Sequence, residues 1–127
     1  MDSVRTKVNA LEKSLGDAQN ARNVDAMAAF YAPDAQSLAN NEKTRVGIEA
    51  IKAGIKRDLA TDSLGNTISY TTTQFWAGGN YVTETGVSTA KDKTGKVVYS
   101  GKYMTLFELR DGKYVCIRDI WNDDAAE

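Results

Sequence analysis

The stretch KVVYSGKYMTLFELRDGKYVCIRDIW, residues 96–121, decides the fold of this chain. It contains two segments rich in valine, tyrosine, threonine and isoleucine, the residue types that favour β-strands. Between them, RDG at residues 110–112 carries the Asp-Gly pair that is typical of a tight hairpin turn. The sequence therefore predicts two neighbouring antiparallel strands, over residues 96–109 and 113–121.

Two further strand-like segments precede this hairpin. Residues 66–77 read NTISYTTTQFWA, and residues 80–90 read NYVTETGVSTA. GGN at 78–80 and KDKTGK at 91–96 have the Gly, Asp and Asn residues of hairpin turns. Because GGN joins two strands and opens no helix, we do not interpret it as a phosphate-binding loop. The four segments together predict an antiparallel meander.

The first half of the chain is predicted to be largely helical. Residues 3–22 and 48–60 repeat apolar side chains at spacings of three and four, which places them on one helix face. Asn23 is a good N-cap for a second helix over residues 24–31, and residues 34–40 look like a short strand. Three helices followed by a meander predict one α+β domain, residues 1–127, whose helices cover one face of a curved antiparallel sheet and enclose a pocket.

Composition excludes several classes of function. The 127 residues carry 16 Lys and Arg against 17 Asp and Glu, without the basic stripe that nucleic-acid binding needs. No segment has the apolar core of a signal peptide or the length of a membrane span, so we expect a cytoplasmic protein that binds neither membrane nor nucleic acid. The absence of histidine removes His-based triads and zinc sites, and we expect no metal and no cofactor. Cys116 is predicted to lie in the core.

Three motifs carry a resemblance to a known family: FYAPDA at 30–35, GIEAIKAGI at 47–55 and DGKYVCIRDIWN at 111–122. With the order of elements, they resemble the nuclear transport factor 2-like superfamily, whose members share a cystatin-like cone. Within it, the chain is most similar to the SnoaL-like and ketosteroid isomerase-like proteins, over about residues 3–123. This cone supports many unrelated functions.

The resemblance implies where an isomerase site would lie. Ketosteroid isomerases have a tyrosine donor, a base carboxylate and a protonated aspartate where this chain has Leu15, Ala39 and Met104. Enolate chemistry needs a base and donors, so the chain is not expected to be a ketosteroid-type isomerase. The resemblance also places Ile117, Asp119 and Trp121 on the pocket side of the last strand.

Three charged residues are candidates for catalysis. Strand alternation places Lys102 and Glu84 on the same side of the sheet as Asp119. Two carboxylates near a lysine could provide an acid and a base with separated pKa values. The alternative is structural, with Asp119 capping backbone amides or pairing with a cation while Glu84 and Lys102 form a cross-strand ion pair.

Other residues are candidates for binding. Arg45 either reaches an anion at the start of the third helix or lies in solvent. A homodimer is expected through the outer sheet face, near Tyr70, Trp76 and Tyr81. The residues expected to contact a small organic ligand are Tyr31, Ile55, Met104, Ile117 and Trp121.

Three functions remain open from the sequence. The first is a small-molecule binding protein with an apolar pocket that contains a few polar groups. The second is a lyase, isomerase or hydrolase that acts on a small organic substrate with Asp119 as acid or base and Glu84 or Lys102 assisting. The third is an association domain whose cavity is filled by its own side chains.

Overall fold

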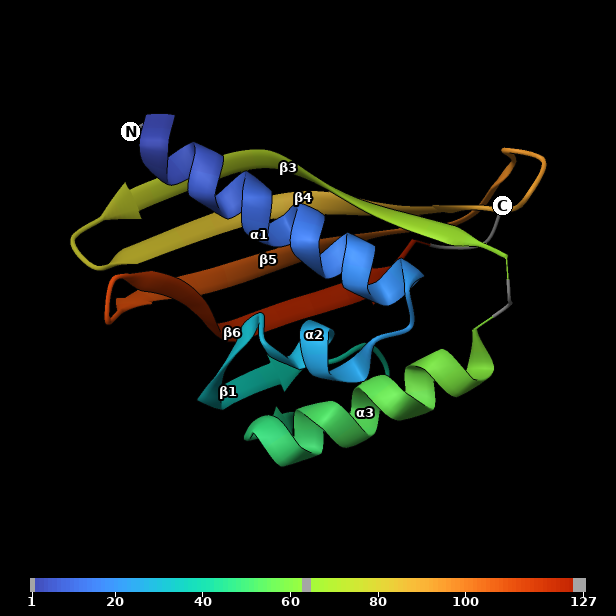
Figure 1. The fold of residues 1–127 in the computed structure, drawn as a ribbon, viewed down its shortest axis with the longest axis horizontal. Helices are drawn as coiled ribbons and strands as arrows, with labels where there is room; N and C mark the ends of the chain where they lie inside the picture. Colours follow the sequence, from blue (N-terminus) through green and yellow to red (C-terminus); the bar gives the residue numbers. More distant parts are fainter. Residues whose placement is uncertain (1, 63–64, 125–127) are drawn as a thin grey trace.

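The protein forms a curved six-stranded sheet with helices packed across it (Figure 1). The computed structural model describes residues 2–62 and 65–124. The strand order is β2-β1-β6-β5-β4-β3. Their bounds are Tyr31–Leu38 (β1), Arg45–Val46 (β2), Thr67–Gly78 (β3), Tyr81–Lys91 (β4), Val97–Arg110 (β5) and Lys113–Asp123 (β6).

Strands β3 to β6 form the predicted antiparallel meander. The hairpin that decides the fold closes between the paired residues Arg110 and Lys113. Its two loop residues, Asp111 and Gly112, have φ values of 50° and 80°. Positive φ at both positions is the backbone of a type I′ turn, whose twist matches that of the strands.

The sheet is mixed, because β1 runs parallel to β6. The prediction of a purely antiparallel sheet is therefore wrong at this one pair, which no hairpin turn connects. The pairing of β1 with β6 shifts between Tyr31 and Gln36. Pro33 lies in this interval and has no N–H to donate to a ladder, so the irregularity falls where pairing is weakest.

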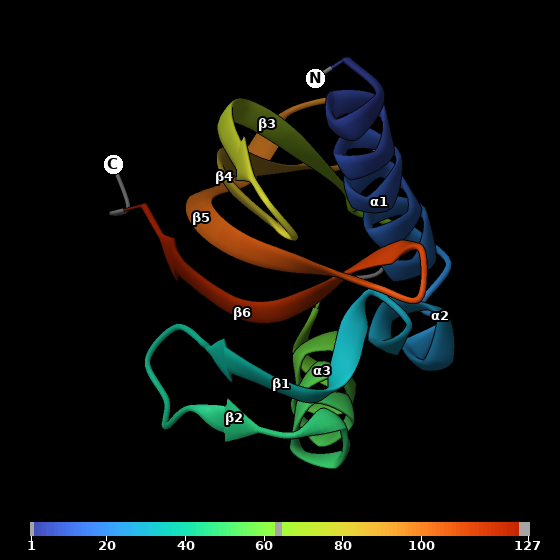
Figure 2. The same ribbon diagram turned by 90° about the vertical axis from the view of Figure 1, so that its left-hand side faces the viewer.

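The three helices are α1 (Asp2–Asn20), α2 (Val24–Ala28) and α3 (Ile48–Thr61). Helix α1 crosses β3, and α3 lies against α2 and β1 (Figures 1 and 2). The Asn23 side chain caps α2 by accepting from the N–H of Ala26 at 3.0 Å. Helix α2 ends earlier than predicted, because the Phe30 carbonyl already accepts from Cys116 N–H in β6. Within the described ranges, no helix has the length and apolar character needed to cross a membrane.

Two apolar clusters fill the space between the helices and the sheet. The first lies around α3 and β1 and contains Ala18, Met27, Ala32, Ala35, Ile51, Ile55 and Leu59. The second lies under α1 and contains Val8, Phe30, Val82, Phe107 and Cys116. Cys116 is fully buried, as predicted.

Candidate functional site

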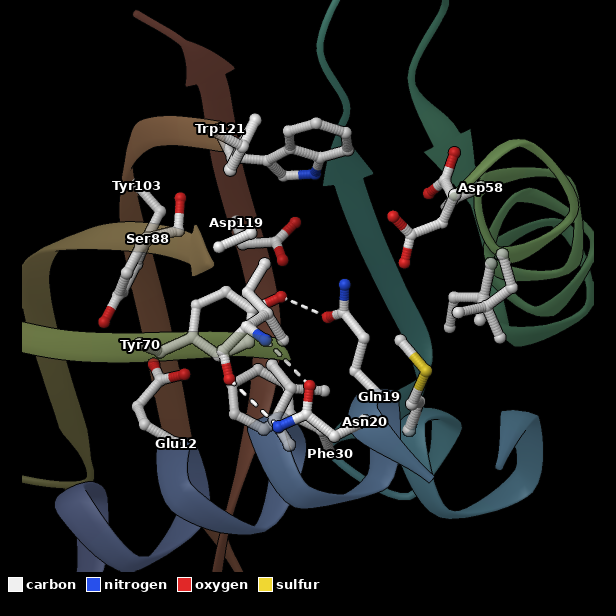
Figure 3. Close-up of a pocket in the computed structure, with 18 of the residues that line it drawn as sticks. Glu12, Gln19, Asn20, Phe30, Asp58, Tyr70, Ser88, Tyr103, Asp119 and Trp121 are labelled. Atoms are coloured by element: carbon white, nitrogen blue, oxygen red, sulfur yellow. Dashed lines mark hydrogen bonds between the residues drawn. The ribbon is translucent and has the colours of Figure 1, made fainter. Parts of the chain in front are cut away.

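A cavity of about 640 Å³ lies between the helices and the inner face of the sheet (Figure 3). Side chains from all three helices and from the sheet contribute to its wall. Among the described residues, its apolar and aromatic lining includes Leu15, Met27, Phe30, Tyr31, Ile55, Leu59, Ile68, Tyr70, Ala90, Val98, Tyr99, Tyr103 and Trp121. Its acidic and basic lining consists of Glu12, Arg45, Asp58, Asp62, Asp119 and Asp123.

One row of paired residues crosses the inner face of the sheet from β1 to β3. Asp119 pairs with Ser37 on one side and with Thr105 on the other, and Thr105 pairs with Glu84, which pairs with Phe75. Asp119 and Glu84 therefore lie on the same face, two strands and about 10 Å apart. The two carboxyl groups share the inner face, as strand alternation predicted, but they do not converge on the cavity, because Glu84 is not among the described residues that line it.

Asp119 lines the cavity and is only 8% exposed. The Tyr31 hydroxyl donates to Oδ2 at 2.9 Å, whereas Oδ1 has no hydrogen-bond partner among the described residues. Burial raises the pKa of Asp119, and the hydroxyl groups of Ser37 and Tyr31 and the charge of Arg45 oppose this rise. Asp119 is thus a buried carboxyl group in the cavity wall, with one oxygen that no described residue pairs.

Glu84 is completely buried. The Thr72 hydroxyl donates to Oε2 at 2.8 Å, and Oε1 finds no partner within the described ranges. Burial raises the pKa of Glu84 to about 8, so the side chain is mostly a neutral acid at neutral pH. Of the two inner carboxyl residues in this row, only Asp119 is among the described residues that line the cavity.

Lys102 and Met104 do not face the cavity, so their predicted placement is wrong. Lys102 is exposed and pairs with Asp124 at 3.0 Å, and Met104 is 46% exposed on the outer face. The cause is a register shift opposite Leu106 and Phe107, where β6 holds the extra residue Ile117. Regular pairing from the turn would place Met104 opposite Asp119, but the shift places Thr105 there instead.

The structure brings three of the five predicted ligand contacts to the cavity: Tyr31, Ile55 and Trp121. Ile117, the bulged residue, packs against the apolar cluster around α3 and is not among the described lining residues. Of the residues predicted for the outer face, Trp76 and Tyr81 are exposed there. Tyr70 instead points inward and donates a hydrogen bond to Gln19 (Figure 3), which corrects its predicted placement.

From the sequence, Arg45 was expected either to lie in solvent or to reach an anion. In the structure it does neither, because it is buried and pairs with two carboxylates. Its guanidinium donates to Glu42 at 2.7 and 3.0 Å and to Asp58 at 3.1 Å, and the residue is 6% exposed. The group lies 5.9 Å from the centre of the Trp121 ring. A Cβ at Gly54 would come within 2.3 Å of the guanidinium, so this glycine makes room for it on α3. Gly54, a glycine in the middle of a predicted helix, was the sequence signal that could have indicated the burial of Arg45.

Two further side chains of the cavity wall, each with a polar atom unpaired among the described residues, were not identified from the sequence. Glu12 on α1 lines the cavity, is 3% exposed and has no partner for Oε2 in the described part of the chain. Tyr103 packs edge-to-face on Tyr70, with 5.8 Å between ring centres, and its hydroxyl is likewise unpaired there. No group of three acidic or cysteine side chains in residues 2–62 and 65–124 could hold a metal ion.

Known structures share this architecture. A protein with a cystatin-like fold from Nostoc punctiforme superposes with a TM-score of 0.87 at 15% identity, covering 96% of this chain and 92% of that one. A ketosteroid isomerase-like protein from Erwinia carotovora gives 0.77 at 14% identity, with 95% and 96% covered. A nuclear transport factor 2-like protein from Shewanella oneidensis gives 0.78 at 22% identity, with 94% and 98% covered.

These structural similarities cover nearly the whole chain, and they agree with the family resemblance of the sequence. No curated protein matches the chain significantly. The SnoaL-like domain family matches residues 12–117, which include the second half of α1 and the strands β1 and β5 that flank β6. The chain therefore belongs to the family of SnoaL-like domains.

Proposed function

We propose that this protein binds a small, mostly apolar organic molecule in its cavity, with Asp119 as the principal polar contact. The observation that carries this proposal is the unpaired Oδ1 of Asp119, buried in the wall of a cavity of about 640 Å³. A buried polar atom without a partner is costly, and a ligand that pairs with it recovers that cost. The aromatic lining supplies flat apolar surface for the rest of the molecule.

The proposal does not extend to ketosteroid-type isomerisation. Leu15 and Ala39 are buried or partly buried apolar residues, and Met104 lies on the outer face. None of the three can act as a base or donate to an enolate. The buried carboxyl groups described above lie in other places, on β6, β4 and α1.

A fluorescence titration tests the binding function. Trp76→Phe leaves Trp121, in the cavity wall, as the only tryptophan. Compounds that raise the melting temperature of the protein are expected to change Trp121 emission, because ligand binding to the native state stabilises it. Asp119→Asn in this background is expected to weaken binding about tenfold, the loss of one charge-assisted hydrogen bond. Stabilising compounds that leave Trp121 emission unchanged would bind elsewhere and contradict the proposal.

A second candidate function is acid–base catalysis by Asp119 on the bound molecule. The specific observation that favours it is the raised pKa of Asp119, which burial causes and which suits a proton-transferring group. Tyr31, which donates to Oδ2, would hold the carboxyl group in place.

Carbon NMR of the Asp119 carboxyl group tests this second function, with Asp119→Asn to assign the signal. We expect titration above the ordinary value for aspartate, because the ionised form is poorly solvated inside the cavity. Titration at about 3.9 or below would remove the support for catalysis and leave the binding function in place.

We also propose a homodimer through the outer sheet face. Leu38, Ile120 and Met104 pair in one row across β1, β6 and β5, and each is at least 38% exposed. Apolar side chains grouped on one sheet face are typical of a protein interface. Ile120→Lys is expected to convert a dimer to a monomer in light-scattering measurements, whereas Val46→Lys, at the edge strand β2, is not. A wild-type monomer at all concentrations contradicts the dimer.

A further inference from the structure

We propose that the molecule bound in the cavity is an organic cation, an amine attached to an aromatic or alicyclic body. This inference rests on the proposed binding function and adds the chemical class of the ligand. It is carried by the charges that line the cavity, by the unpaired oxygens of two buried carboxyl groups, and by the aromatic wall around them.

The charges of the lining are strongly unequal. Among the described residues, five acidic side chains line the cavity and Arg45 alone is basic. The charge of Asp62 is partly balanced by Arg22, which is not among the described lining residues and whose Nη1 lies 3.5 Å from Asp62 Oδ2. The remaining carboxyl groups surround a space with low-dielectric walls, where field lines of one sign are focused. Such a space favours the entry of a cation over that of an anion.

Arg45 does not reverse this imbalance. Its Nε and Nη2 atoms are occupied by Glu42 and Asp58 at 2.7 to 3.1 Å. Arg57 also lies 3.5 Å from Glu42, so the two guanidinium groups and the two carboxylates of this cluster balance, and Arg45 adds no net positive charge to the cavity. An anionic ligand would have to compete with both carboxylates for Arg45 and would meet Asp119 nearby, so the same contacts that hold Arg45 oppose anion binding.

Two carboxyl oxygens in the cavity wall have unused hydrogen-bonding capacity, which suits a ligand's ammonium group. Asp119 Oδ1 and Glu12 Oε2 have no hydrogen-bond partner in the described residues, and both residues are more than nine-tenths buried in the cavity wall. Figure 3 shows the Asp119 carboxyl group directed toward the open space between Trp121 and Gln19. An ammonium group has only donors, which match unpaired carboxylate oxygens. Burial raises the pKa of Asp119, so its ionised form lacks compensation that a cation would supply.

The aromatic wall fits the same ligand. Phe30, Tyr31, Tyr70, Tyr99, Tyr103 and Trp121 line the cavity. Aromatic faces attract cations through the ring quadrupole, most strongly in the case of tryptophan. Trp121 already has a guanidinium 5.9 Å from its ring centre. Aromatic rings together with carboxylates are the side chains that recognise an amine with an apolar body.

Three probes of equal shape test the inference: 4-phenylbutylamine, 4-phenylbutan-1-ol and 4-phenylbutyrate. Binding is measured at neutral pH by Trp121 emission in the Trp76→Phe protein, where the amine is a cation. We expect the amine to bind at least about tenfold more tightly than the alcohol, and the carboxylate to bind most weakly. Equal binding of amine and alcohol, or tighter binding of the carboxylate, overturns the inference while leaving the binding function intact. Failure of all three probes to bind contradicts both.

Matched variants test whether the preference for amine over alcohol arises in the cavity. Asp119→Asn is expected to reduce the preference for amine over alcohol to about threefold or less without weakening the alcohol to the same extent. Asp124→Asn removes a carboxylate that pairs with Lys102 outside the cavity, and it should leave the preference unchanged. Suppose that Asp119→Asn weakens the binding of amine and alcohol by the same factor, or that Asp124→Asn reduces the preference as much as Asp119→Asn does. Either result would show that the recognition of charge does not arise in the cavity.

Discussion

Replacing Glu84 with glutamine is expected to stabilise the protein above pH 8 and to remove most of the pH dependence of its stability. Glu84 is completely buried, and burial raises its pKa to about 8. In the unfolded chain, the same carboxyl group titrates at about 4.3. Between these two values the native state binds more protons than the unfolded state, so stability falls as the pH rises.

The size of this effect follows from the pKa shift. Each unit of pKa difference corresponds to about 1.4 kcal/mol, so ionising Glu84 costs the native state on the order of 5 kcal/mol in total. The stability that the native state has while Glu84 is protonated is fully present below about pH 4.3 and is lost as the pH rises to about 8. Glutamine keeps the shape and can still accept the Thr72 hydrogen bond. It carries no ionisable group, so the Glu84→Gln protein should not follow this decline.

Urea unfolding at acidic, neutral and mildly alkaline pH measures this difference. The chain has no histidine, the one side chain whose ordinary pKa lies between pH 5 and 8, so the slope due to Glu84 is not masked by histidine titration. Asp119, whose pKa is also raised by burial, contributes a decline of the same sign that both proteins share. Glu49→Gln, on the exposed side of α3, should keep the wild-type profile. Parallel profiles for wild type and Glu84→Gln would show that Glu84 is ionised without cost.

Local patterns predicted most of the fold. Strand-forming residues and turn signals placed β3 to β6, and apolar spacing placed α1 and α3, because burying one face of each element is what selects these patterns. The strand β2 has only two residues, too few for any period. The parallel pairing of β1 with β6 is a long-range contact that no local pattern encodes.

The candidate site was predicted in part, and the misplacement of Lys102 and Met104 has one structural cause. Asp119 and Trp121 line the cavity as the family resemblance implied, and they share one face because both follow the bulge and are two residues apart. Tyr31 also lines the cavity, although it begins β1 and does not end the predicted second helix. A β-bulge adds one residue and reverses which side chains face inward relative to the neighbouring strand. The extra residue at Ile117 therefore exchanged Met104 for Thr105 opposite Asp119. Arg45 was missed because its burial depends on Gly54 and on two carboxylates from different elements.

Replacing Gly86 with alanine is expected to destabilise the protein by about 2 to 3 kcal/mol, the usual cost of overpacking a closed site. Gly86 pairs with Tyr103, whose ring lies across it. A Cβ there would come within 2.3 Å of the Tyr103 ring and hydroxyl group and within 2.7 Å of the Thr71 carbonyl oxygen. The ring cannot move away without disturbing Tyr70, so the cavity wall must shift.

Gly78→Ala is the matched control for this variant, because the added Cβ meets no atom within 4 Å and the backbone there is ordinary strand. It should change stability by less than about 0.5 kcal/mol. In Tyr103→Ala, which lacks the ring, Gly86→Ala should cost less than it does in the wild type, since only the contact with the Thr71 backbone remains. Equal costs in the two backgrounds would mean that the backbone contact alone excludes a side chain. In that case the position of Tyr103 in the cavity wall would depend on its contact with Tyr70 and not on the absence of a side chain at Gly86.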